Sequence, residues 1–590
     1  MRELVAYLHD HDQKYILMVD PAIAYADYPP FDRAVEDNVL LQNSDGGVWK
    51  GVVWPGVTAF PDWFSRNIAE YWSGEFEIFF NPETGVDIDG LWIDMNEPAN
   101  PFCDFPCDDP EGAASEYPPE PPPVRQPPRP IPRFPCSFQP NETACEDIAD
   151  KDTPTEATAT STRSLGSGEL RRSNTRAERS EGPHMGLPGR DLLFPKYAIH
   201  NNAPNKDAWA TNNGSISNHT VDTDIIHQNG LTEYDTHNLY GLMMAAASRD
   251  AMLNRRPDVR PLIITRSSFS GSGNKTGHWL GDNESTWTKY RASIRTMLAA
   301  AAIYQMPMVG SDVCGFERNT TEELCARWAA LGAFSPFYRN HNAFVPLISQ
   351  EFYRWDKVAE SAKKAIDIRY RLLDYIYTAF HRQSLDGTPV VSPMFFDYPD
   401  DEETTGLEMQ YFYGPGILVA PATEEGARSA RVYFPDDVFY DWYTHDAINS
   451  MGEYREVDAP LTHIPLFIRG GHVLPIRVKS GMTTTEVREQ DFEVVAALDR
   501  EGRAEGSLYL DDGESLVQNE TSEIKICFEN GSISVTGTFE YATSARLKAV
   551  TVLGLAGESG SEAGDRDTGT KKTTEVDEAL HRTSGFVVTI

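Results

Sequence analysis

Short apolar runs that each end on a charged residue most constrain how this chain can fold. In the run GLWID, residues 90–94, small and apolar residues lead directly to Asp94. Similar runs end on Asp20, Arg266 and Asp312. Continuous apolar runs of this length are typical of parallel strands that are buried on both faces. Because a charge removed from water is costly unless it is paired or used, the ends of these strands are candidate functional positions.

Six apolar runs of this length occur, four of which end on Asp20, Asp94, Arg266 and Asp312, and helical patterns such as TWTKYRASIRTMLAAAAIYQ separate several of the runs. Functional groups at the ends of many different strands favour a (β/α)8 barrel over a doubly wound sheet, which gathers its ligand at one switch point. A closed barrel needs eight strands, so we expect an α/β barrel that lacks two strands upstream of Met1. The six runs are KYILMVDP, GLWID, PLIITR, GHWLGD, PMVGSD and PVVSPMFF, at residues 14–21, 90–94, 261–266, 277–282, 307–312 and 389–396.

The order of these patterns predicts three parts. We expect a partial catalytic barrel over residues 1–400, because helices and apolar strands alternate there. Short alternating runs then predict two small all-β domains, a proximal one at 401–485 and a distal one at 486–590. A stretch rich in Pro, Ser and Thr at about 102–189 interrupts the barrel, and it is too poor in apolar residues to form a packed core. We expect that insertion to be disordered.

Charge excludes two classes of partner. The formal net charge is -37, from 89 acidic and 52 basic residues, and it would repel both nucleic acid and anionic lipid. The sequence has no apolar run of about 18 residues that could span a bilayer. Its start, MRELVAYLHDHDQ, lacks the basic, apolar and small-residue regions of a signal peptide.

The cysteines and glycosylation sequons nevertheless indicate secretion. Seven cysteines predict three disulfides and one free thiol, Cys527, with Cys314 and Cys325 in one group. The pairing within the other group stays open, and a zinc site is the alternative, although the spacings fit no common zinc motif. That group is Cys103, Cys107, Cys136 and Cys145. The Asn-x-Ser/Thr sequons are at Asn141, Asn213, Asn218, Asn274, Asn283, Asn319, Asn519 and Asn530.

Two segments, WIDMNEPAN and TRSSFSGSGNKTGHWLGDNESTW, resemble the active-site segments of glycoside hydrolase family 31, specifically its secreted eukaryotic α-glucosidases. Further similar segments follow in the family's order, among them KYILMVDPAI, VVWPGVTAFPDW, GSDVCGF, LGAFSPFYRNHN and HIPLFIRGG. The cysteines of PFCDFPCDDP and the Pro-rich insertion are most similar to fungal members. The resemblance implies a retaining hydrolase that works with two carboxyl groups and needs neither a cofactor nor a metal.

The resemblance also implies a role for individual residues. Asp94 matches the nucleophile and Asp282 the acid/base, and we interpret Glu97 as an orienting neighbour. Trp279 and Gly281 could supply an apolar environment that raises the pKa of Asp282. The alternatives are a surface salt bridge for Arg266, a satisfied core histidine for His341 and plain core positions for the aromatic residues. The residues that match substrate-binding positions are Arg266, Asp312, His341, Trp54, Trp92, Met95, Trp279 and Phe316.

We therefore expect an exo-acting α-glucosidase that releases glucose from the non-reducing ends of maltose-like oligosaccharides. An α-xylosidase and a transglucosidase of the same family are alternatives, although α-xylosidases usually differ after the nucleophile, where this chain has MNEP. Another alternative is a truncated, non-catalytic fragment, because the family's preceding strand with an aspartate pair and its N-terminal β-sandwich domain have no counterpart here. We expect an oligosaccharide as the partner, with no nucleic acid, membrane or obligate protein partner, and secretion of the full-length parent.

Overall fold

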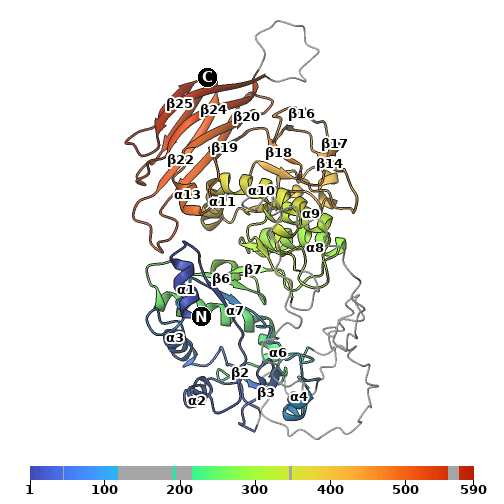
Figure 1. The fold of residues 1–590 in the computed structure, drawn as a ribbon, viewed down its shortest axis with the longest axis vertical. Helices are drawn as coiled ribbons and strands as arrows, with labels where there is room; N and C mark the ends of the chain where they lie inside the picture. The colour runs from blue at the N-terminus through green and yellow to red at the C-terminus, as the bar shows by residue number, and fades with distance from the viewer. Residues whose placement is uncertain (44, 106, 117–190, 194–215, 344–348, 556–569) are drawn as a thin grey trace, which may run out of the picture.

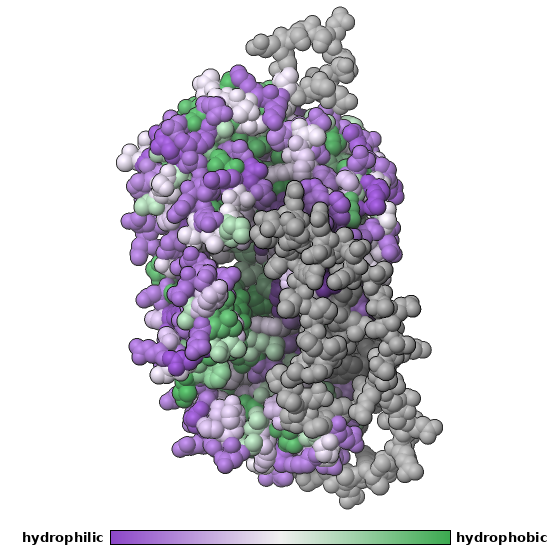
Figure 2. Space-filling view, in the orientation of Figure 1, coloured by the Kyte–Doolittle hydropathy of each residue, from purple (hydrophilic) through white to green (hydrophobic). Residues whose placement is uncertain are grey.

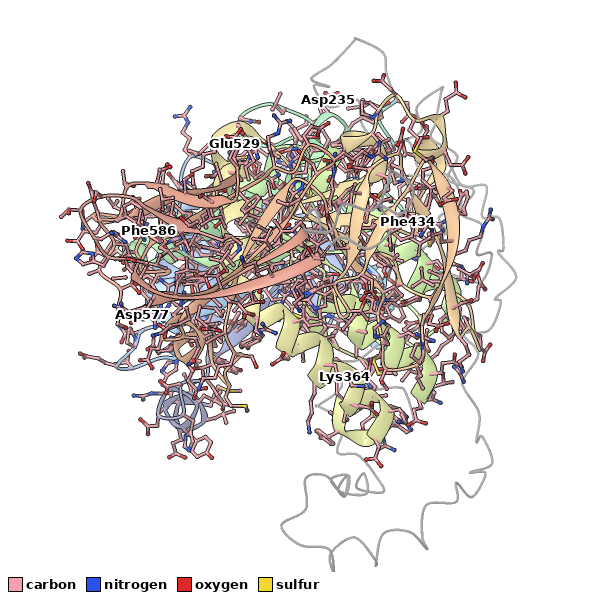
Figure 3. The ribbon with its side chains drawn as sticks, turned by 90° about the horizontal axis from the view of Figure 1, so that it is seen from above. Asp235, Lys364, Phe434, Glu529, Asp577 and Phe586 are labelled. Atoms are coloured by element: carbon pink, nitrogen blue, oxygen red, sulfur yellow. A yellow bond between two sulfur atoms is a disulfide. The ribbon has the colours of Figure 1, made fainter. Side chains whose placement is uncertain are left out.

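The computed structural model describes residues 1–590 except 44, 106, 117–190, 194–215, 344–348 and 556–569. Figure 1 shows helices around a parallel sheet in the lower half of the molecule and two β units in the upper half. Seen from above, Phe434 and Phe586 lie on opposite sides, so the two β units stand side by side (Figure 3). This arrangement confirms the expected barrel-type α/β part followed by all-β structure.

The described residues form one parallel sheet of five strands in the order β1-β5-β6-β7-β8. All neighbouring strands run parallel, and the buried stretches of β5 and β6 continue from one residue to the next, as expected for strands covered on both faces. Five of the six expected strands therefore lie in this sheet. They are β1 (Ile16–Val19), β5 (Gly90–Ile93), β6 (Leu262–Thr265), β7 (Gly277–Trp279) and β8 (Val309–Gly310).

The prediction that the sixth strand belongs to the parallel sheet was wrong. In place of a parallel partner, β11 (Val391–Pro393) pairs antiparallel with β12 (Tyr411–Tyr413) and belongs to a β unit. An apolar run buried on both sides reads the same in a parallel sheet and in the core of a β sandwich, so periodicity does not separate the two. A further parallel pair is instead formed by β9 (Asp312–Val313) and β10 (Arg339–Asn340), and the polar β10 carries no apolar signal in the sequence.

Helices cover this sheet and pack on one another. The indole of Trp72 on α3 donates to Ser248 on α7 at 2.9 Å, and Ser361 on α10 donates to the carbonyl of Ala326 on α9 at 2.8 Å. Thr286 caps α8 by accepting from the Lys289 N–H at 3.2 Å. The main helices are α1 (Arg2–His9), α2 (Pro29–Glu36), α3 (Ile68–Phe79), α4 (Pro110–Glu116), α6 (Glu233–Thr236), α7 (Tyr240–Arg255), α8 (Trp287–Leu298), the π-helical η4 (Ala299–Ile303), α9 (Glu322–Gly332), α10 (Asp356–Arg371), α11 (Leu373–Asp386), α12 (Met394–Asp397) and α13 (Thr484–Arg488).

A small antiparallel sheet is inserted between β1 and α3, in the order β2-β4-β3. Its strands are β2 (Ile23–Ala24), β3 (Lys50–Val53) and β4 (Gly56–Ala59). The turn between β3 and β4 carries Trp54, and the Asn100 side chain accepts from the Val52 N–H at 2.6 Å. This contact fixes the inserted sheet to the loop that follows β5.

The first β unit is a sheet in the order β11-β12-β13-β18-β15-β16, with the pair β14-β17 beside it. The second is an eight-stranded sheet in the order β25-β24-β20-β19-β21-β22-β23-β26, counted over the described residues. We propose that these units are the proximal and distal β domains. The boundary between the two sheets lies between β18 and β19, before the expected domain boundary at residue 485. Their strands, after β11 and β12, are β13 (Ile417–Val419), β14 (Ser429–Phe434), β15 (Val438–Asp441), β16 (Ala447–Asn449), β17 (Glu453–Asp458), β18 (Leu466–Arg469), β19 (His472–Arg477), β20 (Phe492–Ala497), β21 (Ala504–Leu510), β22 (Ser522–Glu529), β23 (Ser532–Gly537), β24 (Arg546–Leu555), β25 (Thr570–Ala579) and β26 (Phe586–Thr589).

Two large apolar cores flank the parallel sheet. One lies under α3 and α7 and includes Leu91 and Ile93 of β5. The other lies under α8 to α11 and continues into the first β unit through Tyr411 and Tyr413. The visible face in Figure 2 is mostly hydrophilic, with a hydrophobic area at mid-height. No helix in the described ranges is long and apolar enough to cross a membrane.

Among the described residues there are two disulfides, Cys103–Cys107 and Cys314–Cys325. Cys527 is a free thiol, as predicted. The pairing left open by the sequence is therefore resolved for Cys103 and Cys107. Cys136 and Cys145 lie outside the described residues, as do the sequons at Asn141 and Asn213 and most of the expected insertion. Within the described part of the chain, no group of three His, Cys, Asp or Glu side chains could hold a metal ion.

Candidate active site

The register of the parallel sheet brings the charged strand ends to one edge. Val19 on β1 is paired with Ile93 on β5, and Ile93 is paired with Thr265 on β6. The next residue along each strand is therefore Asp20, Asp94 or Arg266, and the three side chains start side by side. The carboxyl ends of parallel barrel strands are where such enzymes place their active sites.

Arg266 connects the carboxylates of this edge. Its Nη1 lies 2.9 Å from Asp94 Oδ1, and its Nε and Nη2 donate to the two oxygens of Glu97 at 2.7 and 3.1 Å. A guanidinium presents its donors in a planar fork, so this bidentate pair fixes the orientation of both side chains. The contact with Glu97 agrees with an orienting role for that residue.

The same guanidinium limits the separation of the two proposed catalytic carboxyls. Nη1 of Arg266 lies 2.9 Å from Asp94 Oδ1 and 3.9 Å from Asp282 Oδ2, so these two oxygens are no further apart than the sum of the two distances. Retaining glycosidases separate their carboxyls by about 5–5.5 Å, and inverting ones by about 6.5–9.5 Å. The limit on these two oxygens is compatible with the retaining spacing.

The two carboxyls differ in their surroundings. Burial raises the pKa of Asp94, whereas the charge of Arg266 and the Met95 N–H, which donates to Oδ1 at 2.7 Å, lower it. Burial also raises the pKa of Asp282, with Arg266 opposing the effect and Glu317 adding to it. The side chain of Asp282 is 46% exposed and that of Asp94 is 15% exposed. Asp282 is thus the carboxyl that opens to solvent, and Asp94 is held from two sides.

An aromatic wall stands beside the carboxyls. Trp92 meets Trp279 edge to face at 5.3 Å between ring centroids, and it meets His341 at 5.2 Å. His341 in turn stacks on Phe316 at 5.1 Å. Burial and the charge of Arg339 lower the pKa of His341 to about 4, so its imidazole is neutral at ordinary pH. Flat apolar faces of this kind can pack against the C–H surface of a sugar.

Trp54 and Met95 form the edge of this group. The Trp54 indole donates to Met95 Sδ at 3.0 Å and meets Phe102 edge to face at 5.0 Å between centroids. Met95 is buried, but Trp54 is 58% exposed. Trp54 is therefore the most exposed side chain of this group.

Asp20 and Arg339 belong to the same cluster but are absent from the sequence-predicted set. Burial raises the pKa of Asp20 to about 7, and the charge of Asp94 adds to the effect. Arg339 donates to Asp312 Oδ1 through Nε at 2.9 Å and lies 4.5 Å from the Trp92 ring. Burial raises the pKa of Asp312 to about 7, against the charge of Arg339. The charge at the end of an apolar run is the signal for Asp20, whereas Arg339 lies in the segment LGAFSPFYRNHN, which resembles the family but does not by itself assign the arginine a role.

Several polar atoms of the cluster are buried and have no hydrogen-bond partner among the described residues. Such groups are costly unless something else satisfies them. A ligand with many hydroxyl groups, which both donate and accept, would satisfy carboxylate oxygens and indole N–H groups together. These atoms are Asp20 Oδ1, Trp92 Nε1, Trp279 Nε1 and Asp312 Oδ2.

A parallel β/α sheet whose strand ends bring two carboxyls to one arginine is the arrangement of a barrel-type glycosidase domain. The chain belongs to glycosyl hydrolase family 31. Residues 1–379 match the domain described as "Glycosyl hydrolases family 31 TIM-barrel domain", and residues 387–474 match "Glycosyl hydrolase family 31 C-terminal domain".

Fungal proteins are among the relatives of this chain. It is 52% identical over 587 residues to the probable alpha/beta-glucosidase agdC of Aspergillus flavus. The aligned residues make up 99% of this chain and 62% of that protein. It is 38% identical over 517 residues to the alpha-glucosidase of Mucor javanicus, over 86% of this chain and 53% of that protein. The chain thus spans less than two thirds of the length of these curated relatives.

Solved structures show the same fold. The catalytic subunit in the ER glucosidase II heterodimeric complex superposes with a TM-score of 0.72 at 22% identity, covering 100% of this chain and 55% of that one. A Flavobacterium johnsoniae GH31 dextranase complexed with glucose gives a TM-score of 0.66 at 19% identity, over 94% and 56% of the two chains. At this identity the likeness concerns the fold alone.

Proposed function

We propose that this chain carries the active site of a retaining α-glucosidase, which releases terminal, non-reducing α-linked glucose from maltose-like oligosaccharides. The observation that carries the proposal is the Arg266 guanidinium, whose Nη1 lies 2.9 Å from Asp94 and 3.9 Å from Asp282, an arrangement compatible with the retaining separation. The names of the fungal relatives support glucose as the sugar.

The reaction proceeds in two displacements. In the first, the Asp94 carboxylate attacks the anomeric carbon, the bond to the leaving oxygen breaks, and Asp282 gives its proton to that oxygen. In the second, the Asp282 carboxylate takes a proton from water, whose oxygen attacks the same carbon and releases Asp94. Two inversions at one carbon restore the starting configuration, and Asp282 ends with its proton back. An acceptor sugar in place of water gives transglucosylation by the same steps.

The electrostatics suit this division of roles. Asp94 must be ionised to attack, and the Arg266 charge and the Met95 N–H stabilise the ionised form against burial, which raises the pKa of this carboxyl. Asp282 must hold a proton when the substrate binds, and burial together with Glu317 favours its protonated form. Because Arg266 lies between them, ionisation of one carboxyl changes the pKa of the other.

Sugar recognition is assigned to the atoms that have no partner among the described residues. Asp20 and Asp312 can accept from sugar hydroxyls through their unpaired oxygens, and the indole N–H groups of Trp92 and Trp279 can donate to them. The stacked Phe316 and His341 would contact the sugar's apolar face. We propose an oligosaccharide as the sole required partner, and secretion of the protein on the basis of its disulfides and sequons.

Asn283, a sequon residue, follows Asp282 directly. Its side-chain amide donates to the Asp312 carbonyl at 3.0 Å and accepts from the Phe316 N–H at 2.8 Å. A glycan on this nitrogen would crowd the site, so we propose that Asn283 stays unmodified. Peptide mapping of the secreted, active protein that found it largely glycosylated would contradict the assignment of Asp282.

The test is substrate hydrolysis and covalent trapping with the 590-residue chain. We expect hydrolysis of maltose and of an aryl α-glucoside, and a fluorinated α-glucoside should leave a glucosyl group on the peptide that contains Asp94. Asp94→Asn, a near-isostere without a nucleophile, should reduce kcat by about 10,000-fold or more with little change in thermal stability. Asp436→Asn, on an exposed aspartate paired with Arg500, is the matched control and should keep full activity.

Other outcomes would favour the alternatives. Preference for an aryl α-xyloside over the glucoside would indicate an α-xylosidase. A folded chain that neither hydrolyses nor becomes labelled would indicate a non-catalytic fragment, and labelling at another carboxyl would overturn the role of Asp94.

A further inference from the structure

We propose that Gln350 is a positioning residue that holds the backbones of Gly315 and His341 together and thereby aligns Phe316 and His341 as the sugar-binding wall. The proposal rests on the function proposed above. The Gln350 amide is hydrogen-bonded to neither of the proposed catalytic carboxyls, so its proposed role is positional and not chemical.

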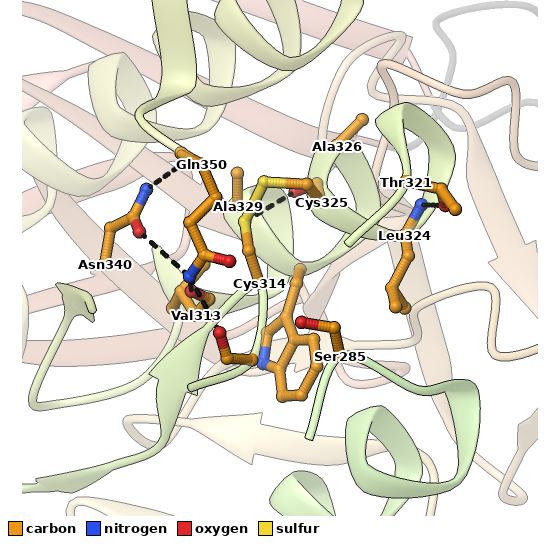
Figure 4. Close-up of a disulfide and its surroundings, with 12 residues drawn as sticks. Ser285, Val313, Cys314, Thr321, Leu324, Cys325, Ala326, Ala329, Asn340 and Gln350 are labelled. Carbon is orange, nitrogen blue, oxygen red and sulfur yellow. Dashed lines mark hydrogen bonds between the residues drawn. A yellow bond between two sulfur atoms is a disulfide. The ribbon is translucent and has the colours of Figure 1, made fainter. Parts of the chain in front are cut away.

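Gln350 is 2% exposed, and its side-chain nitrogen is surrounded by acceptors (Figure 4). It donates to the carbonyls of Gly315 at 2.8 Å and His341 at 2.9 Å, with the carbonyl of Val313 at 3.3 Å and Asn340 Oδ1 at 3.5 Å. The Asn340 side chain donates back to the Gln350 carbonyl at 2.9 Å. One amide group therefore joins the strand end at residue 313, the turn at 315 and the segment at 340–341.

These acceptors require a donor at this place. A side-chain amide has two N–H hydrogens on its nitrogen and none on its oxygen. Three carbonyl oxygens and one amide oxygen surround the nitrogen, so a carboxylate at this position would face only like partial charges. Left without a donor, buried carbonyl oxygens would each cost stability. The site therefore selects glutamine over its close relatives glutamate and methionine.

The turn that Gln350 holds has an unusual backbone. Cys314 and Gly315 both have left-handed conformations, with φ of 72° and 94°. A side chain at Gly315 would also place its Cβ 2.4 Å from the Ser285 nitrogen. The disulfide to Cys325 anchors the turn to α9, and Asn283 accepts from the Phe316 N–H at 2.8 Å. Gln350 supplies a further anchor on the side of His341, beside the Ala343 N–H, which donates to the Phe316 carbonyl at 2.8 Å.

The consequence for the site is geometric. Phe316 follows Gly315 directly, and its ring stacks on His341 with 5.1 Å between centroids and 26° between planes. His341 also meets Trp92 at 5.2 Å. The same amide nitrogen binds the carbonyl next to Phe316 and the carbonyl of His341 itself, so losing it weakens the connection between the two sides of the stack.

A purely structural role for Gln350 is the competing explanation, and Gln383 offers a matched control. Gln383 on α11 is also buried, at 8% exposure, and its amide donates to Gln305 Oε1 at 2.8 Å and accepts from the Val390 N–H at 3.0 Å. Its partners contact none of the site residues named above. Removing this amide should cost stability without changing the site.

The experiment compares Gln350→Met with Gln383→Met in the full chain. NMR of the histidine-labelled protein, with His341→Asn to assign its signal, should show the pKa of His341 rising from about 4 toward its ordinary value of 6.5 in Gln350→Met only. The inhibition constant for glucose should rise about tenfold in Gln350→Met and stay unchanged in Gln383→Met. Both variants should have lower melting temperatures.

Gln350→Glu is the second variant, for the case that Gln350→Met does not fold. A protonated carboxyl keeps one donor, so glucose binding by this variant should recover as the pH falls. Equal effects of the two methionine variants on the histidine signal, or no pH-dependent recovery in Gln350→Glu, would overturn the proposal. The NMR measurement needs no catalysis, so a wild-type chain that fails to bind or hydrolyse glucosides would contradict the proposed function alone.

Discussion

Charged residues occupy different positions in the parallel sheet and in the eight-stranded sheet. Along β22 of the eight-stranded sheet, buried Ile524 and Ile526 alternate with exposed Glu523 and Lys525. Along β5 of the parallel sheet, no charged residue occurs before the strand ends, and the first one is Asp94. A strand with one wet face can place its charges in water, whereas a strand covered on both faces can place them only beyond its end.

This difference explains why the candidate catalytic residues lie at the edge of the parallel sheet. In the eight-stranded sheet, ion pairs such as Arg546 with Asp577 lie on the surface and are largely screened by water. At the edge of the parallel sheet, Asp20, Asp94 and Arg266 lie close enough to shift one another's ionisation. Charges there have large effects because water is partly excluded.

The largest effect we expect, after that of Asp94, is at the acid/base. Asp282→Asn should reduce hydrolysis of maltose by about 100- to 10,000-fold, because the leaving oxygen no longer receives a proton. An aryl α-glucoside with a very good leaving group needs little proton transfer, so its rate of glycosylation should fall much less. Steady-state and burst kinetics on both substrates measure the difference. Equal losses would remove the acid role from Asp282.

Substitutions at Arg266 and Glu97 should shift the pKa of Asp94 in opposite directions. The positive charge of Arg266 lowers the pKa of Asp94, and the negative charge of Glu97 raises it. Arg266→Gln should therefore shift the acidic limb of the kcat/KM profile to higher pH, and Glu97→Gln should shift it to lower pH. We also expect Arg266→Gln to reduce kcat/KM at neutral pH by roughly 10- to 100-fold. Shifts in the same direction for both variants would show that the limb does not report Asp94.

A second group of buried charges lies in the same half of the molecule. His227 contacts Asp62 at 2.8 Å and Glu233 at 2.9 Å, and all three side chains are buried. Burial alone would lower the pKa of His227, but the two carboxylates raise it to about 9. Because the folded-state pKa lies above the ordinary value of 6.5, this stabilisation is complete below pH 6.5 and is lost as the pH rises through 9.

Thermal unfolding between pH 6 and 10 tests this cluster. The melting temperature of the wild type should fall over the window from about pH 6.5 to 9. His227→Gln should be less stable at pH 6 and should lose most of that slope, whereas His581→Gln, on an exposed histidine of the second β unit, should keep it. A wild-type slope that persists in His227→Gln would place its origin elsewhere.

The smallest effect is expected in the eight-stranded sheet. Arg546 and Asp577 form an ion pair at 2.6 Å, but their side chains are 37% and 63% exposed. Arg546→Ala should reduce the free energy of unfolding by less than about 1 kcal/mol and leave kcat and KM unchanged. Denaturant unfolding and maltose kinetics check both parts. A clear change in kcat would show that charge in this sheet reaches the site, against the contrast drawn here.

Individual residues show how far the sequence could lead. Asp94, Asp282 and Arg266 were predictable because each lies in a motif that resembles the family's active-site segments. Asp20 carried only the weaker signal of a charge after an apolar run. Arg339 lies in the similar segment LGAFSPFYRNHN, but its role could not be assigned, since its strand is two polar residues long and its partner Asp312 is 27 positions away. Gln350 is a similar case, because its importance lies in carbonyl groups that every residue possesses.

By itself, the sequence determined the alternation of helices with buried strands, the charges at the strand ends, the alternating β segments and the resemblance to family 31. These are local properties, set by burial and by residue type at short spacing. The tertiary structure decided that β11 pairs antiparallel while β10 pairs parallel, since an apolar or a polar stretch alone does not specify its partner. It also decided that one guanidinium spans Asp94, Glu97 and Asp282, because sheet register, and no spacing along the chain, sets the distance between the ends of different strands.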